Sequence, residues 1–204
     1  MGARPTGSVT AVRAAVVVPV KAFQDAKRRL ASVLSPEERE RLARRMASGV
    51  VAAAGDLPVI VVCDDPAVRD WAGSVGAVAL WTPGLGLDGA VEAGVAHATD
   101  HDADRVLVAH ADLPLARDLR PLVGRAGVVV VPDRHTDGTN VISVPTGSGF
   151  RFGYGPGSFR RHRAEATRLG LPVEVVSDPE LNWDVDVPAD LDLPGGIDLL
   201  ADVG

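Results

Sequence analysis

The stretch PVKAFQDAKRRL, residues 19–30, contains both lysines of the chain, Lys21 and Lys27, whereas the other nineteen basic side chains are arginines. A lysine ammonium is a compact charge on a flexible stem and can follow a phosphate as its charge moves, whereas an arginine is a planar fork suited to fixed bidentate pairs. We therefore expect Lys21, Lys27 and Arg29 to bind an anion, with a solvated basic loop as the alternative. The GxxxxGK[ST] pattern of a P-loop is missing, so phosphate binding must be built differently.

Three aspartates could bind a metal ion. Asp112 lies in VLVAHADLP, and Asp184 and Asp186 alternate along LNWDVDVPADL, so their side chains share one face of an extended segment. Carboxylates without a His/Cys cluster favour a hard cation, Mg²⁺ or Mn²⁺, over zinc. The alternative for each is a cap or first turn of a following helix. His110 points to the same side as Asp112, and we expect it to pack or to form a hydrogen bond rather than to bind metal.

A glycine-rich stretch offers a second anion site. Thr139, Gly155 and Ser158 bring hydroxyl and backbone N–H groups next to an expected helix start, which is a ready position for an anion. A turn without a ligand is the alternative. The stretch GLGLDG, residues 84–89, matches GxGxxG, but it follows the third expected strand instead of the first. We interpret it as a loop against a nucleotide base or ribose, through Gly86 and Asp88, in preference to a nicotinamide site.

Short apolar runs alternate with helical patterns, which predicts a three-layer α/β domain with a mostly parallel sheet, a Rossmann-like arrangement. Ligands bind beyond the carboxyl ends of such strands. Ser35, Pro36 and Glu38 predict a capped helix start, and Gly55 its end. The expected strands span residues 14–20, 58–63, 77–81, 105–111, 127–132 and 172–178, and the expected helices 35–55, 65–76 and 157–170, with a short one near Pro188. Residues 139–144 and 150–155 are expected to form a hairpin insertion.

Composition limits the classes of function. The chain has 204 residues, a formal net charge of −6 and one cysteine, Cys63. The acidic balance argues against a nucleic-acid partner, and no apolar run is long enough to predict a membrane span. A single cysteine fits a reducing cytoplasm. We expect a flexible tail over residues 1–12 and one domain over residues 13–204.

Six motifs in order resemble the 2-phospho-L-lactate guanylyltransferase family, whose bacterial members include phosphoenolpyruvate guanylyltransferases of deazaflavin coenzyme biosynthesis. The motifs are VPVKAFQDAKRRL, SPEERERLARRM, ADLP, PDRHTDGTN, FGYGPGSFRRH and DVDVPADL. The resemblance spans about residues 13–193. It implies a nucleotidyltransferase-like fold, GTP as donor and a three-carbon phosphorylated acid as acceptor, phosphoenolpyruvate or 2-phospho-L-lactate.

The resemblance also assigns roles to residues. It implies that Lys21, Lys27 and Arg29 bind the GTP phosphates. Asp112 and Asp186 would hold Mg²⁺, with Asp184 as a possible substitute, and Thr139, Gly155 and Ser158 would hold the acceptor. The family commonly has Asn where this chain has Asp88.

Two other functions are also compatible with the sequence. A nicotinamide-dependent oxidoreductase would use GLGLDG, and a non-catalytic sensor would bind GTP without releasing pyrophosphate. The sequence is compatible with either acceptor, and with a homodimer that hands its product to a downstream transferase.

Overall fold

The computed structural model describes residues 12–199 and 201, so the predicted tail lies, apart from its last residue, outside the described residues. The described strands form one seven-stranded sheet in the order β3-β2-β1-β4-β6-β5-β7. The strands are β1 (Ala14–Pro19), β2 (Val59–Cys63), β3 (Val78–Trp81), β4 (Arg105–Ala109), β5 (Val128–Pro132), β6 (Thr139–Pro145) and β7 (Val173–Val175).

Most neighbouring strands are parallel, which confirms the predicted fold class. The pairs β1·β2, β1·β4, β2·β3 and β5·β7 are parallel, whereas β6 runs antiparallel to both β4 and β5. The hairpin is formed by β5 and β6. The prediction of a strand over residues 150–155 was wrong, because that segment has no ladder partner and forms an irregular loop.

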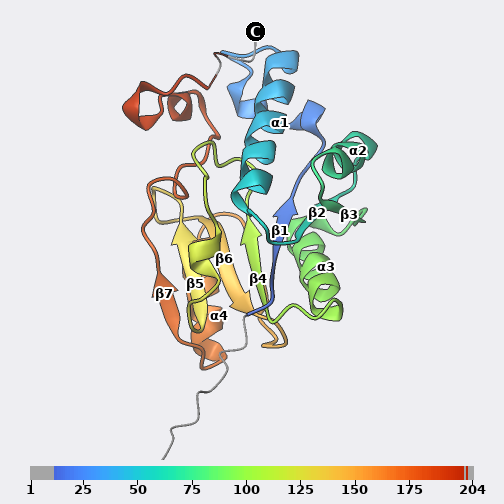
Figure 1. Cartoon of the computed structure of the whole chain (residues 1–204). Coiled ribbons are helices and arrows are strands. Elements are labelled where there is room, and N and C mark those ends of the chain that lie inside the picture. Colours follow the sequence, from blue (N-terminus) through green and yellow to red (C-terminus); the bar gives the residue numbers. More distant parts are fainter. Residues whose placement is uncertain (1–11, 200, 202–204) are drawn as a thin grey trace, which may run out of the picture.

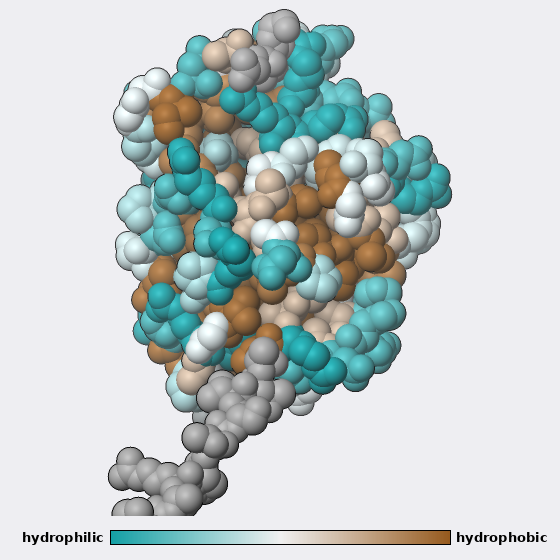
Figure 2. All heavy atoms as spheres, viewed as in Figure 1, coloured by the Kyte–Doolittle hydropathy of each residue, from teal (hydrophilic) through white to brown (hydrophobic). Residues whose placement is uncertain are grey.

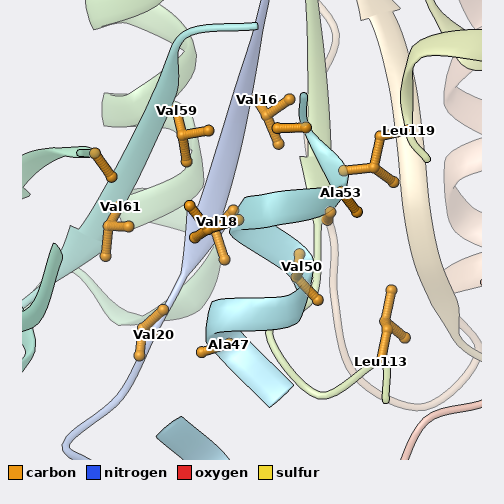
Figure 3. Packing of buried hydrophobic residues seen from close by; sticks show 14 of the residues in the cluster. Val16, Val18, Val20, Ala47, Val50, Ala53, Val59, Val61, Leu113 and Leu119 are labelled. Carbon is orange, nitrogen blue, oxygen red and sulfur yellow. The ribbon is translucent and has the colours of Figure 1, made fainter. Parts of the chain in front are cut away.

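Helices cover both faces of the sheet (Figure 1). They are α1 (Pro36–Ala53), α2 (Pro66–Ser74), α3 (Gly86–Asp100) and α4 (Ser158–Arg168). Side chains alternate along each strand, so Val16 and Val18 of β1 pack in the cluster that contains α1 and α2, whereas Ala15 and Val17 pack in the cluster that contains α3 and α4. Figure 3 shows Val50 of α1 beside Val18 of β1.

Local capping fixes where α1 begins. The Ser35 hydroxyl accepts from the Glu38 N–H at 3.2 Å, and the Glu38 carboxylate accepts from the Ser35 N–H at 2.7 Å. The predicted capping box is therefore confirmed, and Gly55 follows the helix with a φ of 64°. On the other face, α3 packs close to the sheet at Gly94, where an added Cβ would lie 2.7 Å from a methyl group of Val17.

A third apolar cluster brings the end of the chain back to its beginning. Leu30 and Leu34, which follow β1, pack with Leu42 of α1 and with Val185 and Leu193 of the C-terminal segment. Figure 1 shows this segment, in red, returning toward α1. The short 3₁₀ turn Pro188–Leu191 forms where a terminal helix was expected. The cluster therefore carries the aspartates of residues 184–186 toward the lysine segment.

The surface mixes hydrophilic residues with apolar areas on the face shown in Figure 2. None of the helices in residues 12–199 combines the length and apolar character that crossing a bilayer requires.

Candidate active site

The candidate site lies where the parallel strands β1 and β4 end. Because β6 runs antiparallel to β4, its first residues lie at the same edge, with Val141 opposite Ala109. A cavity of about 430 Å³ opens there. Its lining includes Lys21, Lys27, Arg29, His110, Asp112 and Asp186. The structure therefore brings both lysines together with two of the three predicted metal-binding aspartates.

Lys27 lies between two carboxylates. Its Nζ is 2.6 Å from Asp112 Oδ2 and 3.1 Å from Asp186 Oδ1. Burial alone disfavours the ammonium, but the two carboxylates outweigh it and raise the pKa of Lys27. Burial likewise opposes the charge on Asp112, yet Lys27 and then His110 hold the pKa of Asp112 below its usual value. Arg29 Nη1 lies 3.7 Å from Asp186 Oδ2, at the exposed rim.

Two 3₁₀ turns position Lys27. Phe23–Asp25 precedes it and Arg28–Leu30 follows it, and each turn buries one apolar anchor, Phe23 and Leu30. Phe23 packs edge-to-face on Trp71 of α2, with ring centroids 5.2 Å apart. Lys27 itself has a φ of 53° and a ψ of 38°, the left-handed conformation that a residue with a Cβ rarely adopts. The anchored turns hold this strained backbone, and with it the ammonium, in the cavity.

Buried carboxylate oxygens without partners suit a cation. Asp112 Oδ1 and Asp184 Oδ1 are both buried and accept no hydrogen bond. Burial, and after it the Asp112 carboxylate, raises the pKa of Asp184. Oxygen donors of this kind fit Mg²⁺ or Mn²⁺. Within residues 12–199 and 201, no three His, Cys, Asp or Glu side chains converge as a finished metal site, and the Lys27 ammonium lies between two of the carboxylates.

Arg134 fixes the segment that carries Asp184 and Asp186. Its guanidinium stacks 4.4 Å from the Trp183 ring, pairs with the buried Asp190 and donates to the Asp184 carbonyl at 3.2 Å. Asp190 Oδ2 in turn accepts from the N–H groups of Asp186, at 2.6 Å, and Val187. Backbone hydrogen bonds to the Asp190 carboxylate therefore set the direction of Asp186. Sequence reasoning missed Arg134, which is 56 residues from Asp190 in the chain.

The predicted acceptor residues lie together around the loop of residues 150–157. Ser158 is 2% exposed and begins α4, while the preceding Gly157 has a φ of 75° and donates its N–H to Asp137 Oδ2 at 3.0 Å. Arg161 donates to four consecutive carbonyls of the loop. These carbonyls belong to Gly153, Tyr154, Gly155 and Pro156. Arg161 therefore holds the loop and is not free to bind a ligand.

Two further side chains, Asp88 and His162, accept hydrogen bonds from the backbone of this loop and hold it in place. Asp88 Oδ1 accepts from the Tyr154 N–H at 2.8 Å, so the first turn of α3 is tied to the acceptor loop. His162, completely buried, contacts both Thr139 of β6 and Gly153 of the loop. The His110 and Tyr154 rings, with centroids 5.0 Å apart, connect the loop to the cavity. The assignment of Gly86 and Asp88 to the nucleotide stays a prediction, as do the other assigned roles.

The fold is that of nucleotidyltransferases. A provisionally assigned nucleotide-diphospho-sugar transferase from Desulfovibrio desulfuricans superimposes with a TM-score of 0.72 at 18% identity, covering 89% of this chain and 85% of that one. A nucleotidyl transferase from Methanothermobacter thermautotrophicus superimposes with a TM-score of 0.61 at 15% identity, covering 87% of this chain and 94% of that one.

Sequence comparison then gives the family. Residues 14–194 match the family described as guanylyl transferase CofC like, and the chain belongs to it. A phosphoenolpyruvate guanylyltransferase from Sphaerobacter thermophilus is 37% identical over 88% of this chain and 91% of its own. A second phosphoenolpyruvate guanylyltransferase, from Rubrobacter xylanophilus, is 40% identical over 86% of this chain and 90% of its own. A 2-phospho-L-lactate guanylyltransferase from Methanothermobacter thermautotrophicus is 34% identical over 88% of this chain and 83% of its own. The predicted family and the nucleotidyltransferase class are confirmed, which sets aside the oxidoreductase and the non-catalytic sensor.

Proposed function

We propose that this protein transfers GMP from GTP to the phosphate of a three-carbon phosphorylated acid and releases pyrophosphate. Phosphoenolpyruvate is the first choice of acceptor, because the more similar relatives bear that name, and 2-phospho-L-lactate is the second. Both acids carry a carboxylate and a phosphate on adjacent carbons. The product would enter deazaflavin coenzyme biosynthesis.

The observation that supports this function best is the position of Lys27. A charged ammonium lies between Asp112 and Asp186 in a cavity that also contains Lys21 and Arg29. This cavity adjoins the loop of residues 150–157, through His110 and Tyr154. The arrangement provides cations for a triphosphate on one side and polar hydrogen-bonding groups for a smaller anion on the other.

The reaction needs electrostatic stabilisation more than a general base. A phosphate monoester is already an anionic nucleophile near neutral pH, so its oxygen can attack the α-phosphorus of GTP directly. A new P–O bond forms as the bond to the α–β bridging oxygen breaks, and pyrophosphate leaves with that electron pair. Lys21, Lys27 and Arg29 would offset the repulsion between the two anions and the charge on the leaving group.

Mg²⁺ is the expected cofactor. The buried, unpartnered oxygens of Asp112 and Asp184, together with Asp186, are the residues that would hold it. Such an ion supplies Lewis-acid neutralisation of phosphate oxygens. Lys27 would exchange its carboxylate partners for the phosphates of the nucleotide, because it occupies the space between two of these carboxylates.

Three broader properties belong to the same proposal. We place the protein in the cytoplasm, where GTP and the phosphorylated acids are available and where its single cysteine stays reduced. We propose a homodimer that hands its reactive anhydride product to a downstream transferase.

Pyrophosphate release across the nucleoside triphosphates tests the function, with each acceptor supplied separately and the product identified by mass. We expect release with GTP plus Mg²⁺ and one acceptor, and a product mass equal to acceptor plus GMP less water. Pyrophosphate release that does not depend on either acceptor would contradict the proposal.

A further inference from the structure

His162 is a buried histidine that the proposed chemistry does not use. It lies on α4 and is completely buried, beneath the loop of residues 150–157. Its ring contacts the Tyr154 ring edge-to-face, with centroids 4.9 Å apart, and also packs near Phe150 and Phe152. These three rings fix the plane of the imidazole. A buried group held in this way has one defined set of hydrogen bonds.

The tautomer of His162 follows from its partners. The backbone N–H of Gly153 lies 3.1 Å from His162 Nε2, and a backbone N–H can only donate, so Nε2 has no proton. The proton of the neutral ring is therefore on Nδ1. Burial, with the charge of Arg161 next, lowers the pKa of His162 to about 4, which agrees with a neutral ring.

This tautomer decides what the Thr139 hydroxyl can do. His162 Nδ1 lies 3.0 Å from Thr139 Oγ1, so the protonated Nδ1 donates and the hydroxyl oxygen accepts. The hydroxyl proton must point elsewhere. Thr139 is 2% exposed, and among the described residues its hydroxyl makes no other hydrogen bond. A buried donor without an acceptor is unfavourable, so this proton is available for a ligand.

We propose that His162 is a positioning residue that orients the Thr139 hydroxyl as a hydrogen-bond donor toward an anionic group of the acceptor acid. The inference deepens the proposed function and rests on it. An imidazole in the other tautomer would accept from Thr139, which would turn the hydroxyl oxygen toward an anion and repel it. His162 thus selects a negatively charged ligand at this position without carrying charge or touching the ligand.

The histidine tautomer can be measured in the unaltered protein. In a nitrogen-15 spectrum of histidine-labelled protein at neutral pH, we expect His162 to show a protonated Nδ1 and an unprotonated Nε2. A protonated Nε2 would overturn the proposal. This measurement does not depend on whether any variant folds.

Two substitutions separate the two hydrogen bonds of His162. An Asn amide nitrogen takes the place of Nδ1, so His162→Asn keeps the donor to Thr139 and loses the acceptor for Gly153. His162→Gln places its amide near Nε2 and does the reverse. We expect His162→Gln to raise the KM for the acceptor by about ten- to a hundredfold, the size of one hydrogen bond to a charged group. His162→Asn should stay within about threefold. An acceptor KM in His162→Gln equal to or below that of His162→Asn would overturn the proposal.

A double-mutant cycle distinguishes positioning from a purely structural role. Once Thr139→Val has removed the hydroxyl, adding His162→Gln should raise the acceptor KM by no more than about twofold, because the two residues act as one unit. Independent, multiplying effects would overturn the inference. The affinity for GTP, measured by calorimetry, should stay unchanged throughout.

Failure of the inference and failure of the proposed function can be told apart. If unaltered protein releases pyrophosphate with an acceptor but the variants behave contrary to expectation, only the inference fails. If unaltered protein binds GTP but uses neither acceptor, both the function and the inference are overturned.

Discussion

Lys27 combines a strained backbone with a favourable side-chain environment. Its left-handed conformation costs about 1–2 kcal/mol in a residue with a Cβ, and its ammonium compensates by pairing with Asp112 and Asp186. Such strain persists only where the surrounding structure over-determines it, which is common at functional sites. Residues of this kind are where substitutions change chemistry more than folding.

Replacing Lys27 with arginine keeps the charge but not the shape. We expect Lys27→Arg to lower turnover at least about tenfold while changing GTP affinity by less than about threefold, because a planar fork cannot follow charge onto the departing pyrophosphate. Single-turnover rates and calorimetry measure the two quantities. Arg41→Lys, on the exposed side of α1, is the control for a basic exchange. Full turnover in Lys27→Arg would show that any cation suffices.

Removing the charge of Asp112 tests whether its carboxylate binds the metal ion. Asp112→Asn should reduce Mg²⁺-dependent turnover by at least about a hundredfold, as loss of a central electrostatic group commonly does, while the melting temperature changes little. Asp70→Asn, an exposed change on α2, is the matched control. Near-normal turnover at saturating Mg²⁺ in Asp112→Asn would refute its assignment to the metal.

In the loop of residues 150–157, the alternation of apolar side chains could be predicted from the sequence. The hydrogen-bond partners of the loop's backbone could not. Phe150, Phe152 and Tyr154 do alternate inward as a strand would, and pack in the cluster that contains α4. However, the N–H groups of Gly153 and Tyr154 donate to His162 and Asp88, and no strand pairs with them. Side chains distant in sequence thus replaced the sheet ladder, which a local pattern cannot reveal.

The helix starts could be predicted because their determinants are local. Ser35, Pro36 and Glu38 lie within four consecutive positions, and the structure uses them as expected. Lys27 and Asp112 both follow predicted strands, at the edge where ligands were expected to bind, and the structure pairs them at 2.6 Å. By contrast, the clamp of Arg134 on Trp183 and Asp190 joins segments about fifty residues apart, and nothing in either segment alone identifies the partner.

The clamp should stabilise the C-terminal segment. Arg134→Met leaves the buried Asp190 carboxylate without its ion-pair partner, which we expect to lower the free energy of unfolding by about 2–4 kcal/mol. Adding Asp190→Asn should recover part of that loss, because the remaining amide is uncharged and its oxygen still accepts from the backbone. Urea denaturation of the single and double variants measures this. A double variant less stable than Arg134→Met would argue against the buried charge as the cause.

For the molecule as a whole, the buried His162 predicts acid sensitivity. Its pKa is about 4 in the folded state, against an ordinary value of 6.5, and the titratable groups that act on it are Arg161, His110 and Asp88. At a pH between these two pKa values, the imidazole is protonated in the unfolded chain but not in the folded one. The free energy of unfolding therefore falls as the pH is lowered from about 6.5 to about 4. The contribution of His162 to the free energy of unfolding that is lost in this way approaches about 3 kcal/mol. His162→Asn should flatten this part of the stability curve, and an unchanged slope in that variant would contradict the assignment.

The placement of Lys27 also gives the protein an internal counter-ion. Many acidic clusters depend on a dissolved cation for their stability, but here a tethered ammonium lies between Asp112 and Asp186 before any substrate arrives. The melting temperature without nucleotide should therefore shift by no more than about 2 °C between chelator and millimolar Mg²⁺. Lys27→Met should melt lower in chelator and recover when Mg²⁺ is added. When GTP binds, its phosphates would draw Lys27 away from Asp112 and Asp186. The space between these carboxylates would then be open to the Mg²⁺ ion bound to GTP, so that the metal ion and the nucleotide enter together with their charges balanced.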